Sequence, residues 1–338
     1  MRLVIDAFGG DNAPSAVIEG VVTALGSWDD FEIVITGKED AIREELGKYG
    51  PVDMERIRII DAPEIIGCDE QPTLAVKRKK NSSLVAAMEV MARGEAECLI
   101  SAGSTGAVLT GATLIVRRIP GVKRPALAPV MPTVGKPVLL LDCGANADCK
   151  PEYLEQFAIM GSAYMEGVMG ISSPAVGLIN NGEEENKGSE LTKAAYALLK
   201  ETPVNFTGNC EAREIFSGNY DVLVTDGFTG NVILKEVEGF ASALFGILKR
   251  ELTSSFITKL GAGLSKPAFK RVKKLMDYSE YGGAPLLGIN GGIIKAHGSS
   301  DPKAFVNAIR QARQYVSGNV TQKIAERINV VENTKTND

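Results

Sequence analysis

The sequence predicts an α/β fold, because apolar strands repeatedly end in polar, glycine-bearing turns that lead into helices. The clearest case is residues 221–235, DVLVTDGFTGNVILK, where Val222–Val224 has the β-branched, apolar character of a buried strand. Gly227 and Gly230 follow in a turn, and a helix is expected from about Val232. The 338 residues, 44% of them hydrophobic, suffice for a large core in one α/β unit or in two domains.

The other elements follow the same pattern of apolar runs separated by turn residues. We expect strands at residues 3–6, 31–36, 57–61, 98–101, 138–141, 174–179, 222–224 and 292–296, and one more just before Phe206. We expect helices at residues 15–25, 40–49, 73–93 and 301–316, and others that begin after residues 106, 150 and 231. Pro151 suits the first turn of its helix, and Asp301 caps the helix that follows it. The polar tail, residues 332–338, is expected to fray.

Residues 237–281 are expected to form a helical hairpin. Apolar residues at helical spacing run to Leu252, an apolar tip with two glycines spans residues 256–264, and a basic second helix follows. Such a hairpin either contacts an anionic membrane surface or an acidic protein, or packs in a dimer interface with a solvated basic face. A dimer that presents two tips satisfies both interpretations.

Composition limits the possible partners and cofactors. The net charge of −5 gives no reason to expect nucleic acid, and five scattered cysteines without a CxxC pair are typical of a reducing cytosol. We find no signal peptide and no apolar run long enough to span a membrane, so we expect a soluble or at most peripheral protein. A single histidine excludes a multi-histidine metal site, and Walker A, GxSxG and GxGxxG sequences are absent. We therefore expect no metal and no cofactor.

The turns at the strand ends supply mostly neutral hydrogen-bond donors. In an open α/β sheet, ligands bind beyond the carboxyl ends of the strands, so these turns predict an anion site. The candidate phosphate-binding residues are Ser101, Gly103, Ser104, Thr105, Lys187, Gly227, Thr229 and Gly230. The alternative is ordinary helix capping by Ser104, Thr105, Thr229 and Asn231. Lys187 is either a phosphate ligand or a solvated lysine, and its acidic neighbours favour solvation.

This set of residues favours catalysis by positioning and by electrostatic stabilisation. Inorganic phosphate suits such a site, because it is already substantially dianionic near neutral pH and needs no activation. The amides of Asn146, Asn180 and Asn231 are the candidate donors to an oxyanion. Asp226 and His297 are the candidates for moving a proton, although His297 fits a structural role equally well.

Several motifs together resemble the bacterial phosphate acyltransferases of phospholipid synthesis, over residues 1 to about 316. They are DAFGGD (6–11), SAGSTGA (101–107), LDCGAN (141–146), GLIN (177–180), FTGN (206–209), TDGFTGN (225–231), YGGAPLLG (281–288) and HGS (297–299). The TDGFTGN turn is also similar to a turn in phosphotransacetylases. Two positions depart from the family's pattern: Asn12, where histidine is commoner, and Ser104, where asparagine is common.

The resemblance implies a three-layer α/β/α fold of the isocitrate and isopropylmalate dehydrogenase type, with two intertwined halves on one mixed sheet over residues 1–330. It implies a cytoplasmic, peripherally membrane-associated homodimer that moves a long acyl chain from acyl carrier protein to inorganic phosphate. The acyl phosphate would then serve a membrane glycerol-phosphate acyltransferase in phosphatidic acid synthesis. The acidic carrier protein would meet one of two basic sets: Lys270, Arg271, Lys273 and Lys274, or Lys77, Arg78, Lys79 and Lys80.

Three alternatives remain at this point. A short-chain phosphotransacetylase that uses CoA would share the phosphate turns. A dehydrogenase of the same fold is disfavoured by the missing dinucleotide fingerprint and by the lack of a carboxylate cluster for a divalent metal. A non-catalytic protein that binds lipid or the carrier would explain the hairpin but would leave the polar turns without a purpose.

Overall fold

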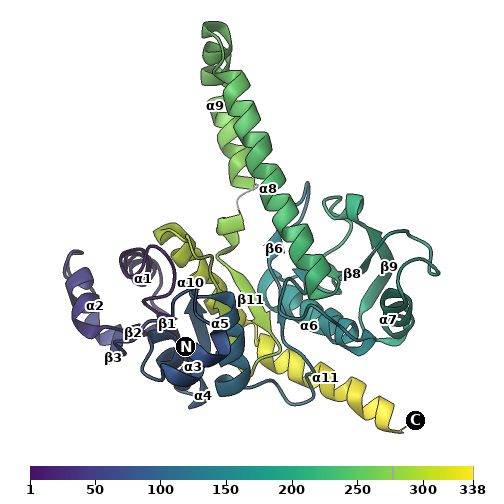
Figure 1. The fold of residues 1–338 in the computed structure, drawn as a ribbon, viewed down its shortest axis with the longest axis horizontal. Helices are drawn as coiled ribbons and strands as arrows, with labels where there is room; N and C mark the ends of the chain where they lie inside the picture. Colours follow the sequence, from purple (N-terminus) through teal and green to yellow (C-terminus); the bar gives the residue numbers. More distant parts are fainter. Residues whose placement is uncertain (276–277, 338) are drawn as a thin grey trace.

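Two β-sheets form the centres of two lobes in the computed structural model, which describes residues 1–275 and 278–337 (Figure 1). The first lobe has a seven-stranded sheet in the order β3-β2-β1-β4-β12-β11-β5. Its strands are β1 (Arg2–Asp6), β2 (Glu32–Gly37), β3 (Ile57–Asp61), β4 (Cys98–Ser101), β5 (Ala126–Leu127), β11 (Ala284–Leu287) and β12 (Gly292–Lys295). The first five strands in this order (β3, β2, β1, β4 and β12) are mutually parallel, whereas β11 pairs antiparallel with both of its neighbours.

The second lobe has a five-stranded sheet in the order β6-β7-β10-β8-β9. Its strands are β6 (Val130–Met131), β7 (Val138–Leu141), β8 (Ala175–Asn180), β9 (Asn205–Glu211) and β10 (Val222–Val224). All pairs are parallel except β6 with β7. The α/β fold is therefore confirmed, but the expected single mixed sheet is wrong: two separate mixed sheets are present, and the short segment from β5 to β6 connects them. The first sheet combines strands from both ends of the chain.

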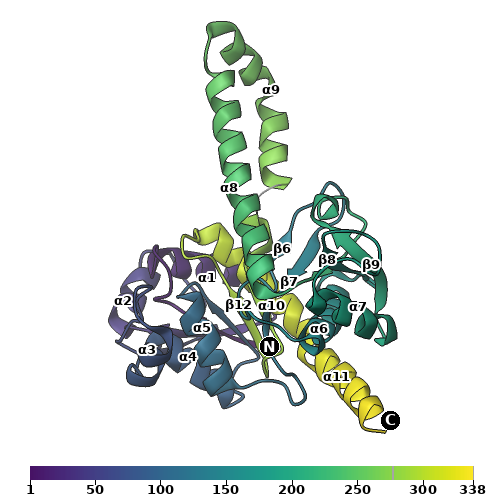
Figure 2. The same ribbon diagram turned by 45° about the vertical axis from the view of Figure 1, so that its right-hand side comes forward.

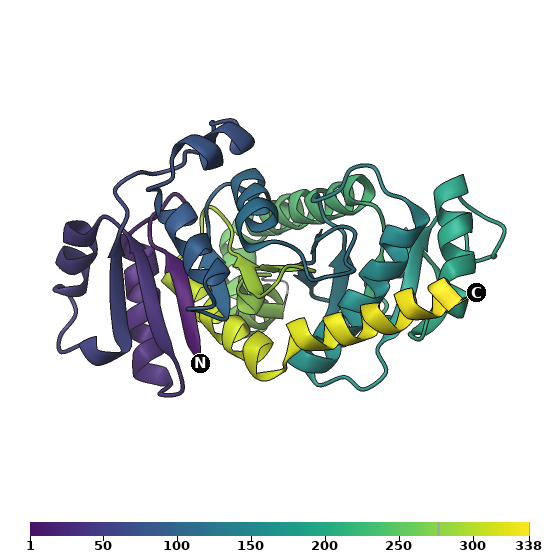
Figure 3. The same cartoon turned by 90° about the horizontal axis from the view of Figure 1, so that it is seen from below.

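Helices cover both faces of each sheet. They are α1 (Ser15–Ser27), α2 (Glu39–Leu46), α3 (Pro72–Arg78), α4 (Ser83–Ala92), α5 (Thr105–Gly111), α6 (Pro151–Met169), α7 (Glu190–Glu201), α8 (Gly227–Leu252), α9 (Phe256–Leu275), α10 (Pro302–Ser317) and α11 (Val320–Asn337). Val17 of α1 and Phe305 of α10 are buried on one face of the first sheet, and Met88 of α4 is buried on the other. In the second lobe, α6 and α11 cover the sheet with Phe157 and Ile328. Figure 3 shows α11 running beneath the second lobe.

Helices α8 and α9 form the expected hairpin, which projects away from both lobes (Figures 1 and 2). Residues 276 and 277 of this segment, and Asp338, lie outside the described residues. No helix among the residues described is long and apolar enough to cross a membrane.

Four local expectations differ from the structure. The helix predicted over residues 73–93 is two helices, because the chain breaks after α3 and Ser82 accepts a hydrogen bond from Val85 N to cap α4. Phe206 lies within β9 rather than after a strand. Helix α8 begins at Gly227, five residues earlier than expected, with Asp226 as its cap. The tail expected to fray is helical as far as Asn337.

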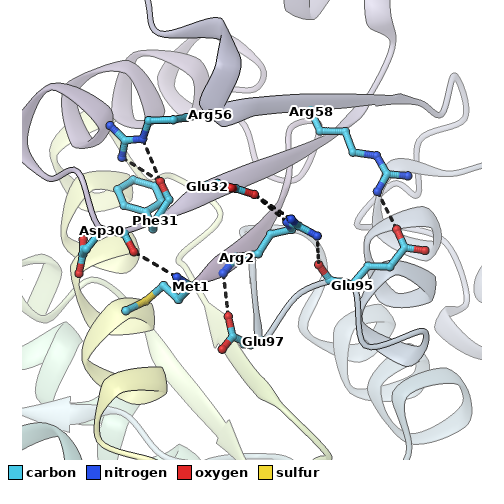
Figure 4. A network of polar contacts seen from close by, with 9 residues as sticks. All are labelled: Met1, Arg2, Asp30, Phe31, Glu32, Arg56, Arg58, Glu95 and Glu97. Carbon is cyan, nitrogen blue, oxygen red and sulfur yellow. Dashed lines mark hydrogen bonds and ion pairs between the residues drawn. The ribbon is translucent and has the colours of Figure 1, made fainter.

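A polar network joins the amino ends of the strands in the first sheet (Figure 4). Arg2 N donates to Glu97, and the Arg2 guanidinium pairs with Glu32 at 2.8 Å. Arg58 pairs with Glu95 at 2.7 Å. Exposed pairs of this kind contribute little stability each. The carboxyl ends of the parallel strands lie at the opposite edge, and the candidate site is found there.

Candidate active site

The first half of the site lies at the carboxyl ends of β1, β4 and β12, which are neighbours in the sheet. Asp6 ends β1 and is buried, and the Ser101 hydroxyl donates to Asp6 Oδ2 at 2.7 Å. Ser101 Oγ in turn accepts Gly103 N at 3.0 Å. Burial raises the pKa of Asp6, and its hydrogen bonds from Ser83 and Ser101 oppose that rise. Ser101, predicted to bind phosphate, therefore holds the turn in shape instead.

The turn after β4 keeps two hydroxyls available. Ser104 precedes α5 but makes no side-chain capping bond, and Thr105 is exposed. Within the described part of the chain, no hydrogen bond is found for either hydroxyl. The Ser104 side chain thus does not cap α5, so the alternative of ordinary helix capping is wrong for this residue. Both hydroxyls remain candidates for binding an anion.

Lys295 is a cation at this turn that sequence reasoning missed. It ends β12, and its ammonium donates to the carbonyl oxygens of Ala102, at 3.4 Å, and of Ala296. Burial lowers the pKa of Lys295 to about 8, although Asp6 and Asp11 oppose this shift. The sequence signal that could have identified Lys295 is a lysine at the end of the otherwise apolar run GIIK.

The loop that carries His297 is tied to the loop after β1. Asn12 Nδ2 donates to the carbonyl oxygens of Ser299, at 3.3 Å, and Ser300, at 3.1 Å. His297 is exposed, and its Nδ1 lies 2.8 Å from Ser299 Oγ and accepts Ser299 N. The structure thus places His297 in the first lobe, on the same edge of the sheet as Lys295. Asn12 acts here as a link between the two loops.

The second half of the site surrounds Asp142, a buried carboxylate just after β7. Its Oδ1 accepts Leu127 N and Ala145 N, and its Oδ2 accepts the backbone N and the Nδ2 of Asn146. Burial raises the pKa of Asp142, and these donors oppose the rise. Asn146 Nδ2 also donates to the carbonyl oxygen of Pro125 at 2.7 Å, so both of its hydrogens are used. The expected oxyanion role of the Asn146 side chain is therefore corrected: Asn146 positions the turn.

Helix α8 packs its first turn directly on this segment. Gly227 N donates to Asn146 O at 2.8 Å, and a Cβ at Gly230 would lie 1.9 Å from Asp142 O. Both glycines are buried and allow close packing of two backbones, rather than the approach of phosphate that the sequence predicted. Asp226 accepts Thr229 N on Oδ1 and the Thr229 hydroxyl on Oδ2, both at 2.8 Å. Asp226 and Thr229 thus form a helix cap, which leaves neither as the expected acid or phosphate ligand.

Asn231 is different from these residues. It is exposed on the first turn of α8, close to Gly144, and its amide makes no hydrogen bond among the residues described. Asn180 ends β8 at the same edge of this sheet, but its Nδ2 donates to Lys187 O and its Oδ1 accepts Asn181 N. Lys187 lies 3.9 Å from Glu184 and is half exposed, as a solvated lysine would be. Among the residues described, Asn231 thus keeps both amide hydrogens available for an oxyanion, whereas Asn180 keeps one.

A cavity of about 330 Å³ lies between the two lobes. Leu109 and Thr110 of α5 and Pro125, just before β5, line it from the first lobe, and Ala145 and Asn146 line it from the second. Helix α5, which begins directly after Ser104, and the turn with Asn146 therefore border one space, although they belong to different lobes. Asp226 is connected to that space through the bond from Gly227 to Asn146.

Cys149 lies beside this cavity, with its thiol 3.5 Å from Asn146 O. Burial raises the pKa of Cys149 to about 11. At neutral pH the group is therefore a thiol, which is a poor nucleophile. The protonated thiol of Cys149 thus argues against a covalent intermediate on this cysteine and favours a reaction in which one substrate attacks the other directly.

Neither of the two basic sets expected to meet a carrier protein is among the residues that line the cavity. Lys270 and Arg271 are exposed on α9, and Lys273 and Lys274 belong to the same helix but their side chains lie outside the described residues. In the other set, Lys79 pairs with Glu70 at 2.6 Å, which leaves Lys77, Arg78 and Lys80 exposed.

Comparisons with known proteins agree with this architecture. A family model described as "Fatty acid synthesis protein" matches residues 1–323. A phosphate acyltransferase from Clostridium perfringens is 54% identical over 329 residues and covers 97% of each chain. Another from Bacillus licheniformis is 53% identical over 329 residues, covering 97% of this chain and 98% of the relative. A solved phosphotransacetylase from Streptococcus pyogenes has a TM-score of 0.60 with 18% identity over 94% of each chain, a likeness of fold.

Proposed function

This chain belongs to the phosphate acyltransferase family, whose members transfer an acyl group to phosphate, and we propose that its donor is a long-chain thioester of acyl carrier protein. The proposed product is an acyl phosphate, used by a membrane glycerol-phosphate acyltransferase to make phosphatidic acid. The observation that carries the proposal is the half-buried ammonium of Lys295 at the turn where the hydroxyls of Ser104 and Thr105 have no partner among the residues described.

In the proposed reaction, phosphate lies on the turn that carries Ser104 and Thr105 and is held by Lys295. One phosphate oxygen attacks the thioester carbonyl, a C–O bond forms, and Asn231 donates to the oxyanion that develops. The C–S bond then breaks, and the electron pair leaves with sulfur. The thiolate needs little help, because an ordinary thiol has a pKa of about 8.5.

The test is to supply labelled phosphate with acyl carrier protein thioesters or with acyl-CoA of matched chain length. We expect labelled acyl phosphate, with a higher kcat/KM for the carrier-protein donor. A preference for acetyl-CoA would instead identify the short-chain phosphotransacetylase, which is the alternative that shares this fold. Reversing the charge of Lys270 and Arg271 should slow the reaction with the carrier protein only, and added salt should reduce the difference.

We further propose that the hairpin serves both a homodimer and a membrane surface in the cytoplasm. Phe256, Ile257 and Leu264 at its tip are 80% or more exposed, and basic residues follow on α9. A row of exposed apolar residues also continues down α8, including Phe240, Leu244 and Ile247. Apolar surface of this extent is typical of a contact with lipid or with a second chain.

Replacing Phe256 and Leu264 by serine is expected to abolish binding to anionic vesicles in a flotation assay, because it removes the most exposed apolar side chains at the tip. Acyl-phosphate formation from soluble donors should be unchanged, since the tip is remote from the cavity. Val134→Ser, at an apolar residue that is 92% exposed in a loop of the second lobe, is the matched control. Wild-type vesicle binding by the double variant would refute the membrane role of the hairpin. A monomeric protein that still binds vesicles would refute its role in a homodimer.

A further inference from the structure

The cavity between the lobes carries two guanidinium groups that the site described so far does not use. Arg118 and Arg124 both line it and both are exposed. No carboxylate pairs with either among the residues described, whereas many other arginines of this chain form ion pairs. Arg118 donates to Lys123 O, and Arg124 lies 5.8 Å from the centre of the Tyr153 ring. Two unpaired guanidiniums at one cavity indicate an anionic ligand.

The backbone that presents these arginines is irregular. Helix α5 continues into a π-helical turn, η2 (Ala112–Val116), and this turn contributes Thr113 and Leu114 to the cavity wall. Arg117 follows with φ of 73°, a conformation that is unfavourable for a residue other than glycine. Such π turns and left-handed residues occur preferentially at functional positions. Here they end the helix and turn the chain back, so that Arg118, Arg124 and Pro125 line the same cavity as α5.

The rest of the wall suits a neutral chain rather than a second small anion. Leu109, Leu114, Pro125 and Ala145 are apolar, and Thr110 supplies a hydroxyl. The arginines are exposed, whereas Pro125 is buried and Asn146 is half-buried. A ligand that fills this cavity thus has its negative charge at the solvent end and an amphipathic chain that reaches toward the donor turns.

We propose that this cavity holds the phosphopantetheine arm of the acyl donor, with Arg118 and Arg124 binding its phosphodiester. The inference rests on the proposed function, which supplies a thioester donor of this chemical class. The arm consists of a phosphate, a branched apolar segment and two amides, and ends in the sulfur that carries the acyl group. Seated in this direction, it delivers the thioester to Asn146 and the adjoining first turn of α8, where Asn231 is found.

The test compares two donors that differ only in the phosphate, acyl-phosphopantetheine and acyl-pantetheine. In Arg118→Gln and Arg124→Gln we expect the KM for the phosphorylated donor to rise about tenfold or more, the factor for losing one charge-assisted hydrogen bond. The KM for acyl-pantetheine and the KM for inorganic phosphate should not change. Lys123→Gln is the matched control, because Lys123 pairs with Glu332 of α11 at 3.1 Å. Arg124→Lys keeps the charge and should recover part of the affinity.

Calorimetric titration with phosphopantetheine itself gives a readout that does not depend on turnover. Tighter binding of phosphopantetheine than of pantetheine by the wild-type protein, lost in both glutamine variants, supports the inference even if the acyl acceptor is not phosphate. Equal effects on both donors, a rise in the KM for inorganic phosphate, or no change in either titration would overturn it. Failure of the wild-type protein to make acyl phosphate from any donor is a different result, which refutes the proposed function alone.

Discussion

Replacing Asn231 by alanine is expected to lower kcat for acyl-phosphate formation about 10²- to 10³-fold, with little change in the KM of either substrate. Loss of one donor to a developing oxyanion has an effect of this size, because the bond strengthens only in the transition state. Folding should be unaffected, since Asn231 is exposed and its amide has no partner among the residues described. The measurement is single-turnover formation of labelled acyl phosphate, with thermal unfolding followed in parallel.

Two further variants make this result interpretable. Asn219→Ala removes an exposed amide from the loop before β10, at the opposite edge of the sheet, and should retain wild-type rates. Ser104→Ala should instead raise the KM for phosphate, because Ser104 is proposed to hold phosphate rather than the oxyanion. Full activity of both Asn231→Ala and Ser104→Ala, with normal folding, would show that this site assignment is wrong.

Lys295→Met should lower kcat/KM for phosphate by about 10² or more, since it removes the half-buried cation proposed to bind a dianion. The wild-type protein should also show a distinctive pH dependence. The pKa of Lys295 is lowered to about 8, so the ammonium predominates below that pH and is lost above it. The KM for phosphate should therefore rise as the pH increases through about 8, and Lys295→Met should lack this rise. Inorganic phosphate also titrates near neutral pH, and the comparison with Lys295→Met removes this contribution, because both proteins bind the same phosphate.

Lys193→Met is the control for this prediction, because Lys193 is exposed on α7. Initial rates at several phosphate concentrations from about pH 7 to about pH 9.5 suffice. A wild-type KM that is constant across this range, or a pH dependence that persists in Lys295→Met, would remove Lys295 from the phosphate site. Arginine carries a larger planar fork in place of the compact ammonium, so Lys295→Arg is expected to restore activity only in part.

The sequence predicted most of the strands and the edge at which the site forms, because both follow from local patterns, but it missed the short strands β5 and β6. It did not reveal which polar groups are already satisfied. In the sequence, Asn146 and Asn231 are both amides in glycine-bearing turns. In the structure, Asn146 Nδ2 donates both of its hydrogens, to Asp142 and to Pro125 O, whereas the Asn231 amide donates none among the residues described. Gly227 and Gly230 look like phosphate-binding glycines, but close contact with a distant turn explains both. Partners of this kind come from other elements, so no local pattern records them.

Lys295 and the two cavity arginines were missed for a related reason. Lys295 is separated from Ala102 by most of the chain, and only the pairing of β12 with β4 brings them together. Arg118 and Arg124 belong to no motif and face a cavity that exists only when the lobes meet. The break between α3 and α4 was not predicted from the sequence either, because residues 73–93 keep helical spacing throughout. Ser82 nevertheless caps a new helix.

The placement of β12 between β4 and β11 also affects how the protein is made. At about 5–20 residues per second, the ribosome needs roughly 10–40 s after β4 to deliver β12. During that interval the three amino-terminal strands and β4 have an open edge, whereas all five strands of the other sheet have already been synthesised. The first part of the chain to emerge is thus the last to acquire its complete sheet. A nascent chain stalled before residue 284 should leave β4 as an unpaired edge that a chaperone can bind.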